Sequence, residues 1–365
     1  MKDTELFIKE VLDASYSLGE IVEVKEIKAG DTNNSFMAYV RSGSDSDEPV
    51  RWYVRQYNEG EEERDIIFEH ALEEYMAERV NGEVQTILPV KTKAGGTWVV
   101  EEYKGRKNFY AVFNVISGNE PYSWEYNNMS EAALDSCAEI TAKFHAWSYG
   151  FRAPEGSGKS ESPLEEQFGE WKECFRKGLE AKKEEPEVFR RFTDYFEGEI
   201  DELCRIVDFC SGEFAKYKDD LAMCVNHKDL NPGNLMFDDD DRVCAVFDMD
   251  WCNYDYRIYD IAWMGYQAIA SWDTDSWGKV PVRNLDRFVE TYNKVMIERE
   301  CPLGPLNRSE TEFLPVMMII GAIKVLADFI FYEEHHHDAP RLFVNSWRFI
   351  ESVKDLKRYV DSKNQ

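Results

Sequence analysis

Positive charge is scarce in this chain of 365 residues, which has 43 lysines and arginines against 71 aspartates and glutamates. The formal net charge is −28 and the isoelectric point lies near 4.7. A surface this acidic repels the phosphates of nucleic acids and of anionic membranes, so we expect neither as a partner. The charge is compatible with a cationic small ligand, and equally with the general solubility of an acidic protein.

Cysteine pairs and long apolar runs are also missing. The eight cysteines include no C-x-x-C pair and no regular framework, and the N-terminus lacks the pattern of a signal peptide. Both features predict reduced thiols and a cytoplasmic protein. The most apolar stretch, residues 316–323, is followed by Lys324 and Asp328 and is too short to span a bilayer. It predicts a buried helix.

Glycine is scarce between the first two predicted strands, residues 21–27 and 35–40. The connecting segment 28–34 has only Gly30. A glycine-rich loop lets several backbone N–H groups approach a phosphate, and this segment has no such run. Glycine content therefore gives little evidence for a phosphate loop, and the segment alone is ordinary hairpin chemistry.

The chain has the composition of a folded protein and is long enough for two lobes. Apolar residues make up 43% and aromatic residues 14% of the 365 positions, which is enough for a substantial core. These fractions exclude a disordered chain. The sequence contains no internal repeat.

The most informative stretch is V-N-H-K-D-L-N-P-G-N at residues 225–234, followed by V-F-D-M-D-W at residues 246–251. Alternating apolar residues predict a short strand that leads into the first segment, and Pro-Gly predicts a tight bend. Residues 235–247 then predict a β-hairpin with an acidic turn. A hairpin of this length is expected to return Asp248 beside Asn234.

The residue types of this loop are those that phosphoryl transfer requires. One carboxylate takes the proton of a hydroxyl, while an amide and a second carboxylate hold Mg²⁺ on a nucleotide. We assign Asp229 as the base, and Asn234 and Asp248 as magnesium ligands, because Mg²⁺ prefers hard oxygen ligands. His227 is expected to support the loop through a ring bond to backbone near Asp248. For Asp250 three roles stay open: support, a metal contact or a substrate contact.

The stretch from His227 to Asp250, with R-I-Y-D-I-A at residues 257–262, resembles the aminoglycoside phosphotransferase and choline kinase superfamily. It looks nearest to type II homoserine kinases and N-acetylhexosamine kinases. The resemblance covers nearly the whole chain and implies an α+β, two-lobed, protein-kinase-like fold. It implies a nucleotide-binding lobe at residues 1–118, with a small antiparallel β-sheet and one main helix. A larger, mostly helical lobe at residues 119–365 is expected to hold the catalytic loop and the acceptor.

One position of the catalytic loop departs from the family, which usually has glycine between the histidine and the aspartate. This chain has Lys228 there. We expect Lys228 either to help neutralise phosphate charge or to point into solvent.

The resemblance also suggests residues that hold ATP. Arg55, on a strand predicted at residues 51–57, falls where a kinase-like fold places its phosphate-binding lysine, and an arginine there can fork onto phosphate oxygens. Its expected partner on the following helix is Glu69 by register, with Glu73 as the alternative. Asn33 completes a Gly-x-x-Asn pattern similar to that of homoserine kinases, in which polar side chains help to bind phosphate.

Further strands are predicted at residues 97–103 and 109–116, and the second leads into the hinge between the lobes. Backbone groups around Asn114 and Ile116 are expected to bond adenine. This placement rests on chain order alone, because backbone recognition leaves little side-chain signature.

The second half of the sequence predicts mainly helices. Lys324, in K-V-L-A-D-F, lies in a stretch that looks like one that approaches the acceptor in N-acetylhexosamine kinases, so it is a candidate substrate contact. A buried or snorkelling lysine is equally compatible with the sequence. The predicted helices are residues 130–147, 164–183, 186–210, 255–270, 282–298, 309–333 and 340–360.

The leading hypothesis is a kinase that uses ATP and Mg²⁺ to phosphorylate a hydroxyl of a sugar, an amino sugar or an amino alcohol. The alternative from another class is a catalytically silent, kinase-like nucleotide-binding protein, suggested by Lys228 and the glycine-poor loop. A metal-dependent hydrolase that uses Asp248 and Asp250 lacks the usual histidine ligands. The sequence leaves open the acceptor, the choice between ATP and GTP, and the oligomeric state.

Overall fold

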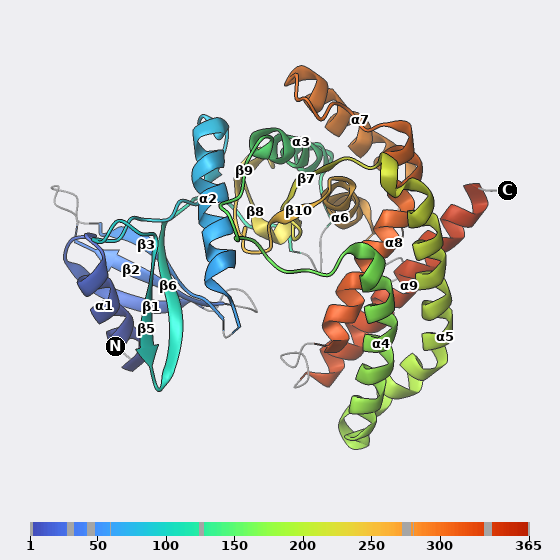
Figure 1. Ribbon diagram of the computed structural model, residues 1–365, viewed down its shortest axis with the longest axis horizontal. Coiled ribbons are helices and arrows are strands. Elements are labelled where there is room, and N and C mark those ends of the chain that lie inside the picture. The colour runs from blue at the N-terminus through green and yellow to red at the C-terminus, as the bar shows by residue number, and fades with distance from the viewer. Residues whose placement is uncertain are drawn as a thin grey trace. The chain divides into compact units, whose positions relative to one another are not determined.

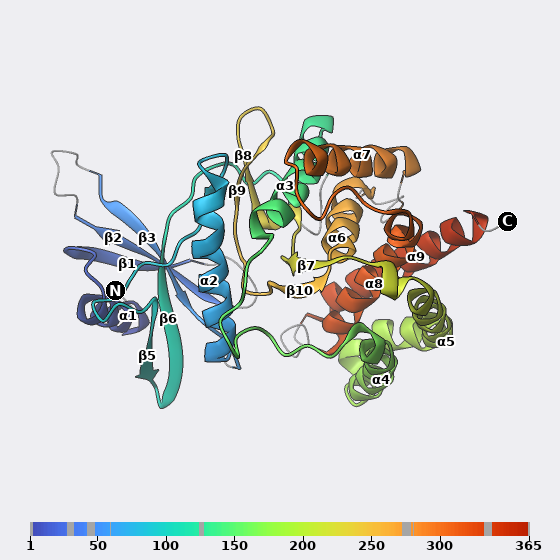
Figure 2. The same cartoon turned by 45° about the horizontal axis from the view of Figure 1, so that its top comes forward.

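The chain forms two compact units, which are described separately (Figures 1 and 2). The computed structural model describes residues 3–27, 33–41, 48–58, 60–123, 128–271, 279, 281–331 and 338–363. Unit 1 comprises Met1–Asn119, Gly150–Lys159 and Cys244–Cys252. Unit 2 comprises Glu120–Tyr149, Ser160–Val243 and Asn253–Gln365. The lobe boundary expected at residue 118 stays a prediction.

Unit 1 is built on a five-stranded sheet whose strand order is β1-β2-β3-β6-β5, and every neighbouring pair is antiparallel. The strands are β1 (Ile21–Ile27), β2 (Asn34–Val40), β3 (Val50–Gln56), β5 (Trp98–Tyr103) and β6 (Arg106–Asn114). Two helices accompany this sheet, α1 (Asp3–Ser15) and α2 (Glu63–Val80). Most of the segment expected to hold the nucleotide loop, residues 28–32, lies outside the described residues.

Strand β6, which lies between β3 and β5, is buried on both faces of the sheet. Tyr110 and Val112 belong to a core cluster that includes Ile8 and Leu12 of α1. Ala111 and Phe113 point the other way and belong to a second cluster, with Ile66 of α2. This alternation is the period of two that strand geometry dictates. It explains why α1 and α2 lie on opposite sides of the sheet in Figure 1.

Unit 2 is mostly helical, and helix α8 (Arg308–Phe331) lies at its centre, in contact with α4, α5, α6 and α9. Residues 308–330 are long and apolar enough to cross a membrane, but 83% of the apolar window is buried inside the unit. The buried helix expected around residues 316–323 is therefore confirmed. The other helices are α3 (Glu131–Ser148), α4 (Leu164–Lys183), α5 (Pro186–Tyr217), α6 (Ile258–Ile269), α7 (Val282–Glu298) and α9 (Ala339–Lys363).

The prediction of one helix over residues 255–270 is wrong at its start. Residues 253–256 form strand β10 (Asn253–Tyr256), which pairs antiparallel with β7 (Met223–Asn226), and α6 begins only at Ile258. Backbone pairing with a strand far away in the sequence overrides the local helical pattern here. The consequence matters for the site, because β10 lies directly beside the strand that leads into the catalytic loop.

Strands β8 (Leu235–Phe237) and β9 (Val243–Val246) flank the acidic turn, which is closed by a bond from Asp238 N–H to Arg242 O (2.8 Å). The hairpin expected at residues 235–247 is present. β9 begins in unit 2 and continues into unit 1, where it pairs in parallel with β4 (Gln85–Thr86). The residues that follow β9, including Asp248 and Asp250, therefore belong to unit 1.

Unit 1 is built on an antiparallel sheet and unit 2 is mostly helical. Together they give the architecture of the expected α+β class. The α+β prediction is confirmed.

Candidate active site

The predicted catalytic loop follows β7 in unit 2 and is held at its start by Asp260 of α6. The backbone N–H of His227 donates to Asp260 Oδ2 (2.6 Å), and that of Lys228 donates to Oδ1 (2.9 Å). Asp260 is fully buried. One buried carboxylate thus fixes two successive peptide groups, and these immediately precede Asp229.

Asp229 lies in this loop with each carboxylate oxygen bonded to an asparagine side chain. Asn231 Nδ2 donates to Oδ1 (3.0 Å) and Asn234 Nδ2 donates to Oδ2 (2.8 Å). Both amides also donate to the Asp229 carbonyl oxygen, at 3.0 and 2.8 Å. The loop therefore aims the carboxylate, and two of the predicted site residues, Asp229 and Asn234, are in direct contact.

Asn231 is a site residue that the sequence analysis missed. It is 4% exposed, and its Oδ1 accepts the N–H of Gly233 (2.8 Å) while its Nδ2 holds Asp229. The signal was present in the sequence, because asparagine before Pro-Gly commonly bonds the backbone two residues on. The same turn chemistry that predicts the bend therefore also predicts a bond of the asparagine side chain.

His227 is fully buried, and its ring lies 5.5 Å from the ring of Phe144 of α3. This position agrees with a supporting residue. The expected bond from its ring to backbone near Asp248 joins residues of different units and stays a prediction.

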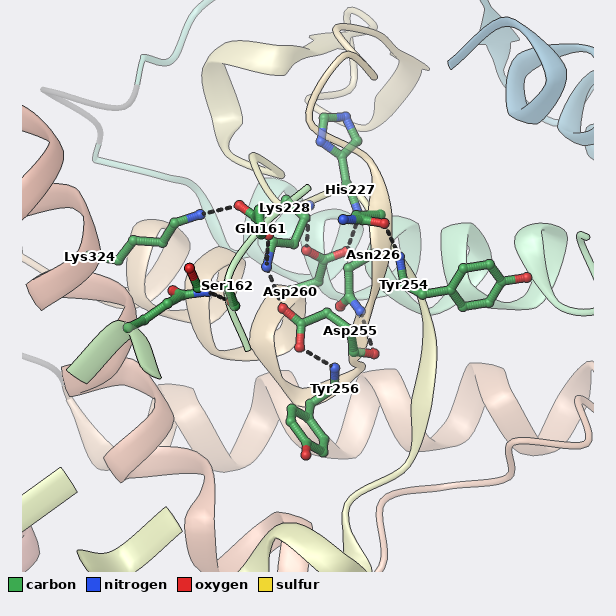
Figure 3. A network of polar contacts seen from close by, with 12 residues as sticks. Glu161, Ser162, Asn226, His227, Lys228, Tyr254, Asp255, Tyr256, Asp260 and Lys324 are labelled. Atoms are coloured by element: carbon green, nitrogen blue, oxygen red, sulfur yellow. Dashed lines mark hydrogen bonds and ion pairs between the residues drawn. The ribbon is translucent and has the colours of Figure 1, made fainter. Parts of the chain in front are cut away.

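Lys228 does not point into solvent, so that expectation is wrong. It is 5% exposed, and its ammonium pairs with Asp255 of β10 and with Glu161 (3.1 Å), as Figure 3 shows. Its Nζ also lies 4.6 Å from the centre of the Tyr259 ring. Burial acts to lower the pKa of Lys228, but the two carboxylates outweigh it and the pKa is raised. The group is therefore charged at neutral pH.

Lys324 of α8 reaches the same carboxylate from the other side, with 3.3 Å between its Nζ and Glu161 Oε1 (Figure 3). Burial acts to raise the pKa of Glu161, but the charges of Lys324 and Lys228 outweigh it, so the pKa lies below its ordinary value. The carboxylate of Glu161 is thus ionised between two lysines. The role of Lys324 as a substrate contact stays a prediction.

In unit 1, Arg55 of β3 is bonded to two carboxylates. Its Nη1 donates to Glu69 Oε1 (2.7 Å) and its Nη2 donates to Asp248 Oδ1 (2.9 Å). The side chains of Arg55 and Glu69 are 4% and 2% exposed. The Tyr57 hydroxyl adds a bond to Glu69 Oε2 (2.9 Å). Between the two glutamates left open by the sequence, the structure pairs Arg55 with Glu69.

Glu73, one turn further along α2, is buried without an ion pair among the described residues. Neither carboxylate oxygen has a hydrogen-bond partner in that part of the chain. Burial, with the negative charge of Glu69, raises the pKa of Glu73 well above its ordinary value. Burial therefore disfavours the charged form of Glu73, and no described cation compensates it as Arg55 compensates Glu69.

Asp250 and Asn33, which lie far apart in the sequence, are in contact in unit 1. Asn33 Nδ2 donates to Asp250 Oδ2 (3.0 Å), and Asn33 Oδ1 accepts the N–H of Asn58 (3.0 Å). Asp250 is 7% exposed, whereas the side chain of Asp248 is 37% exposed. Of the two carboxylates after β9, Asp248 is thus the more accessible to a ligand.

The residues expected at the hinge have structural partners of their own. The Asn114 N–H donates to Leu88 O (3.3 Å), and Asn114 Nδ2 donates to Thr86 O (3.1 Å). Ile116 packs against the core cluster that contains Phe113. A nucleotide bond to the Asn114 N–H requires replacement of the bond to Leu88, so its carbonyl and the backbone near Ile116 are the simpler candidates.

The donor set fits a divalent cation that prefers oxygen. Asn234 uses Nδ2 for Asp229, which directs the amide oxygen, a hard ligand, away from that bond. Asp248 offers a half-exposed carboxylate that shares one oxygen with Arg55. Asn234 belongs to unit 2 and Asp248 to unit 1, so a joint ligand set stays a prediction.

Comparison with protein families gives a direct result for this chain. Residues 24–295 match the family model described as the phosphotransferase enzyme family. Because the match covers more than half of the 365 residues, the chain belongs to this family. No curated protein matches the chain in sequence.

Solved structures with the same fold include three kinases. A microcompartment-associated aminopropanol kinase has a TM-score of 0.66 at 16% identity, with 98% of each chain covered. An amicoumacin kinase in complex with AMP-PNP and Ca²⁺ has a TM-score of 0.65 at 13% identity, with 97% of this chain and 94% of that chain covered. Choline kinase from Cryptosporidium parvum has a TM-score of 0.63 at 14% identity, with 99% and 97% covered.

These comparisons confirm the expected superfamily and the two-lobed, kinase-like fold. The family match also confirms that the chain is an enzyme, a phosphotransferase. The acceptor, the metal and the residue roles belong to the proposal below.

Proposed function

We propose that this protein transfers the γ-phosphate of ATP to a hydroxyl of a sugar, an amino sugar or an amino alcohol, with Asp229 as the catalytic base. The observation that carries the proposal is the geometry of Asp229. Its carboxylate is held by two asparagine amides, in a loop whose preceding peptide groups are clamped by Asp260. Such preorganisation is what a base needs in order to orient a hydroxyl.

Asp229 receives the proton of the acceptor hydroxyl as that oxygen bonds to the γ-phosphorus. The bond between the γ-phosphorus and the bridging oxygen breaks, and ADP leaves with the electron pair. Mg²⁺ bound to ATP supplies positive charge to the phosphate oxygens. Asn234 and Asp248 are the proposed ligands of that ion.

The remaining proposed roles concern nucleotide binding in residues 1–118. Arg55, held by Glu69, presents a fixed positive charge to phosphate. Asn33 contributes through its contact with Asp250, which supports the metal-binding segment. Backbone groups around Asn114 and Ile116 bond adenine. Residues 119–365 hold the catalytic loop and the acceptor.

The choice of acceptor is supported by charge and by likeness. The net charge of −28 favours cationic amino alcohols and amino sugars over anionic acceptors. Aminopropanol, choline and ethanolamine kinases have the same fold at 16% identity or less. We therefore rank an amine-bearing alcohol or sugar before a neutral polyol.

The test is ADP release with Mg²⁺ and ATP against a panel of sugars, amino sugars, homoserine, choline, ethanolamine, aminopropanol and aminoglycosides. We expect one class of acceptor to stimulate ADP release. Asp229→Asn should lower turnover by about 10²- to 10⁴-fold, the usual contribution of a general base, and should retain ATP binding. Full turnover in Asp229→Asn would refute the assignment of the base. ATP binding without turnover on any acceptor would favour the catalytically silent alternative.

A further inference from the structure

Lys228 carries two unfavourable features at the position directly before Asp229. Its φ is +68°, in the left-handed region that glycine adopts freely and a lysine adopts only under strain. Its side chain is 3% exposed, so its charge has been removed from water. A glycine would avoid both costs. The contacts of the lysine side chain therefore have to offset these two costs.

The Lys228 ammonium joins segments that are distant in the sequence. It pairs with Asp255 of β10 and with Glu161 (3.1 Å), and Glu161 in turn pairs with Lys324 of α8 (3.3 Å). Figure 3 shows Lys228 and Lys324 approaching Glu161 from different directions. Both carboxylates that Lys228 contacts are only 22% exposed. The ion pairs are thus partly shielded from solvent, and shielded ion pairs are stronger than those at an exposed surface.

Residue 228 is consequently fixed at both its backbone and its side chain. Its N–H is bonded to Asp260 and its ammonium to Asp255 and Glu161. Asp229 is the next residue in the chain. The backbone angles at residue 228 therefore set the direction in which Asp229 points. The ammonium is occupied by two carboxylates, which argues against a role in neutralising phosphate.

We propose that Lys228 is a positioning residue for phosphoryl transfer, whose ion pairs with Asp255 and Glu161 hold the left-handed loop that aims Asp229 at the acceptor. This inference rests on the proposed function of Asp229 as the base. It assigns Glu161 to the same task, because Glu161 ties the loop to Lys324 of α8.

The test compares Lys228→Met with Lys228→Arg and with a matched control. Lys354 is the control: it also lies between two carboxylates of unit 2, Glu199 (2.6 Å) and Glu351 (3.2 Å), but on α9. We expect Lys228→Met to lower kcat by about 10- to 100-fold, the effect of a small misplacement of a reacting group, with little change in the KM for ATP. Lys228→Arg should retain most of kcat. Lys354→Met should lower Tm without lowering kcat.

Glu161→Gln provides a second route if Lys228→Met does not fold. It should also lower kcat at unchanged KM for ATP. The double variant with Lys228→Met and Glu161→Gln should lose less kcat than the product of the two single losses, because each substitution alone already breaks the same ion pair. Normal kcat in Lys228→Met or in Glu161→Gln, with Asp229→Asn inactive, would overturn this inference and leave the proposed function intact. Full activity of Asp229→Asn would refute both.

Discussion

Arg55 and Asp248 are directly bonded, with 2.9 Å between Arg55 Nη2 and Asp248 Oδ1, while the other end of the guanidinium is bonded to Glu69. The two partners differ in exposure: Glu69 is 2% exposed, and Asp248 is 37% exposed. The buried pair is thus the fixed part of the arrangement, and Asp248 is the part open to a ligand. In the proposed function, the same carboxylate binds a cation and the same guanidinium binds phosphate. Nucleotide binding would then redistribute charges that already balance one another.

The first prediction separates the two glutamates of α2. Glu69→Gln removes the charge that balances Arg55, so we expect the KM for ATP to rise by about 10- to 100-fold, as for loss of a charged hydrogen bond. Glu73→Gln should leave the KM and the free energy of unfolding nearly unchanged, because burial disfavours the charge of Glu73 and its carboxylate has no hydrogen-bond partner among the described residues. ATP titrations and urea unfolding of both variants measure this. Equal effects of the two substitutions would contradict it.

The second prediction concerns the divalent cation. Mg²⁺ and ATP together should raise the Tm of the wild-type protein. At a ligand concentration one hundred times Kd, binding adds about 2.7 kcal/mol to the free energy of unfolding. Asp248→Ala and Asn234→Ala should each reduce the part of this shift that depends on Mg²⁺. Asp240→Asn, an exposed aspartate of the nearby turn, is the control and should shift like the wild type. A full Mg²⁺-dependent shift in Asp248→Ala would remove that residue from the ligand set.

The third prediction tests Asn231 as a holder of the base. Asn231→Asp keeps an acceptor for the Gly233 N–H and loses the Nδ2 donor that bonds Asp229 Oδ1 and the Asp229 carbonyl oxygen, so it changes only the contacts with Asp229. We expect kcat to fall by about 10- to 100-fold with a small loss of stability, because Asp229 then meets a negative charge in place of a donor. Steady-state kinetics and thermal melts separate these effects. Unchanged kcat in Asn231→Asp would show that Asn234 alone suffices to aim the carboxylate.

The fold was largely predictable from local patterns. The strand at residues 21–27 and the helices at residues 164–183 and 282–298 were predicted with the bounds that the structure has. Both helices begin directly after a proline, Pro163 or Pro281, which marks a helix start clearly. The start of α6 was not predictable in this way, because β10 exists only through its pairing with β7.

The site was predictable in its loop but not in its distant partners. Asp229 and Asn234 lie within one short motif, and their contact follows from a local turn. The charge of buried Lys228 is balanced in part by Glu161. Glu161 is paired in turn with Lys324, which lies 163 residues from it in the sequence. No local pattern reports such a pairing. An exposed lysine and a buried, ion-paired lysine have the same sequence signature.

The last prediction is a pH dependence of stability that arises from His70 of α2. His70 is 3% exposed, and its ring nitrogens are bonded to the Tyr57 hydroxyl (2.9 Å) and to Thr97 Oγ1 (2.7 Å). Burial, helped by the charges of Arg55 and Lys91, lowers the pKa of His70 from 6.5 to about 3. The folded protein therefore keeps this imidazole neutral over a range in which the unfolded chain protonates it.

Between pH 6.5 and about pH 3 the unfolded state binds this proton and the folded state does not. The stability that His70 contributes is fully present above pH 6.5, and it falls by at most about 1.4 kcal/mol for each pH unit below that value. His70→Gln cannot titrate but can still bond Tyr57 and Thr97. We expect it to be less stable than the wild type at pH 7, with a difference that shrinks as the pH falls. Urea unfolding of both proteins at pH 7, 6, 5 and 4 measures this difference, in which contributions from the other ionisable groups cancel. A difference that stays constant across that range would show that His70 titrates alike in the folded and unfolded chains.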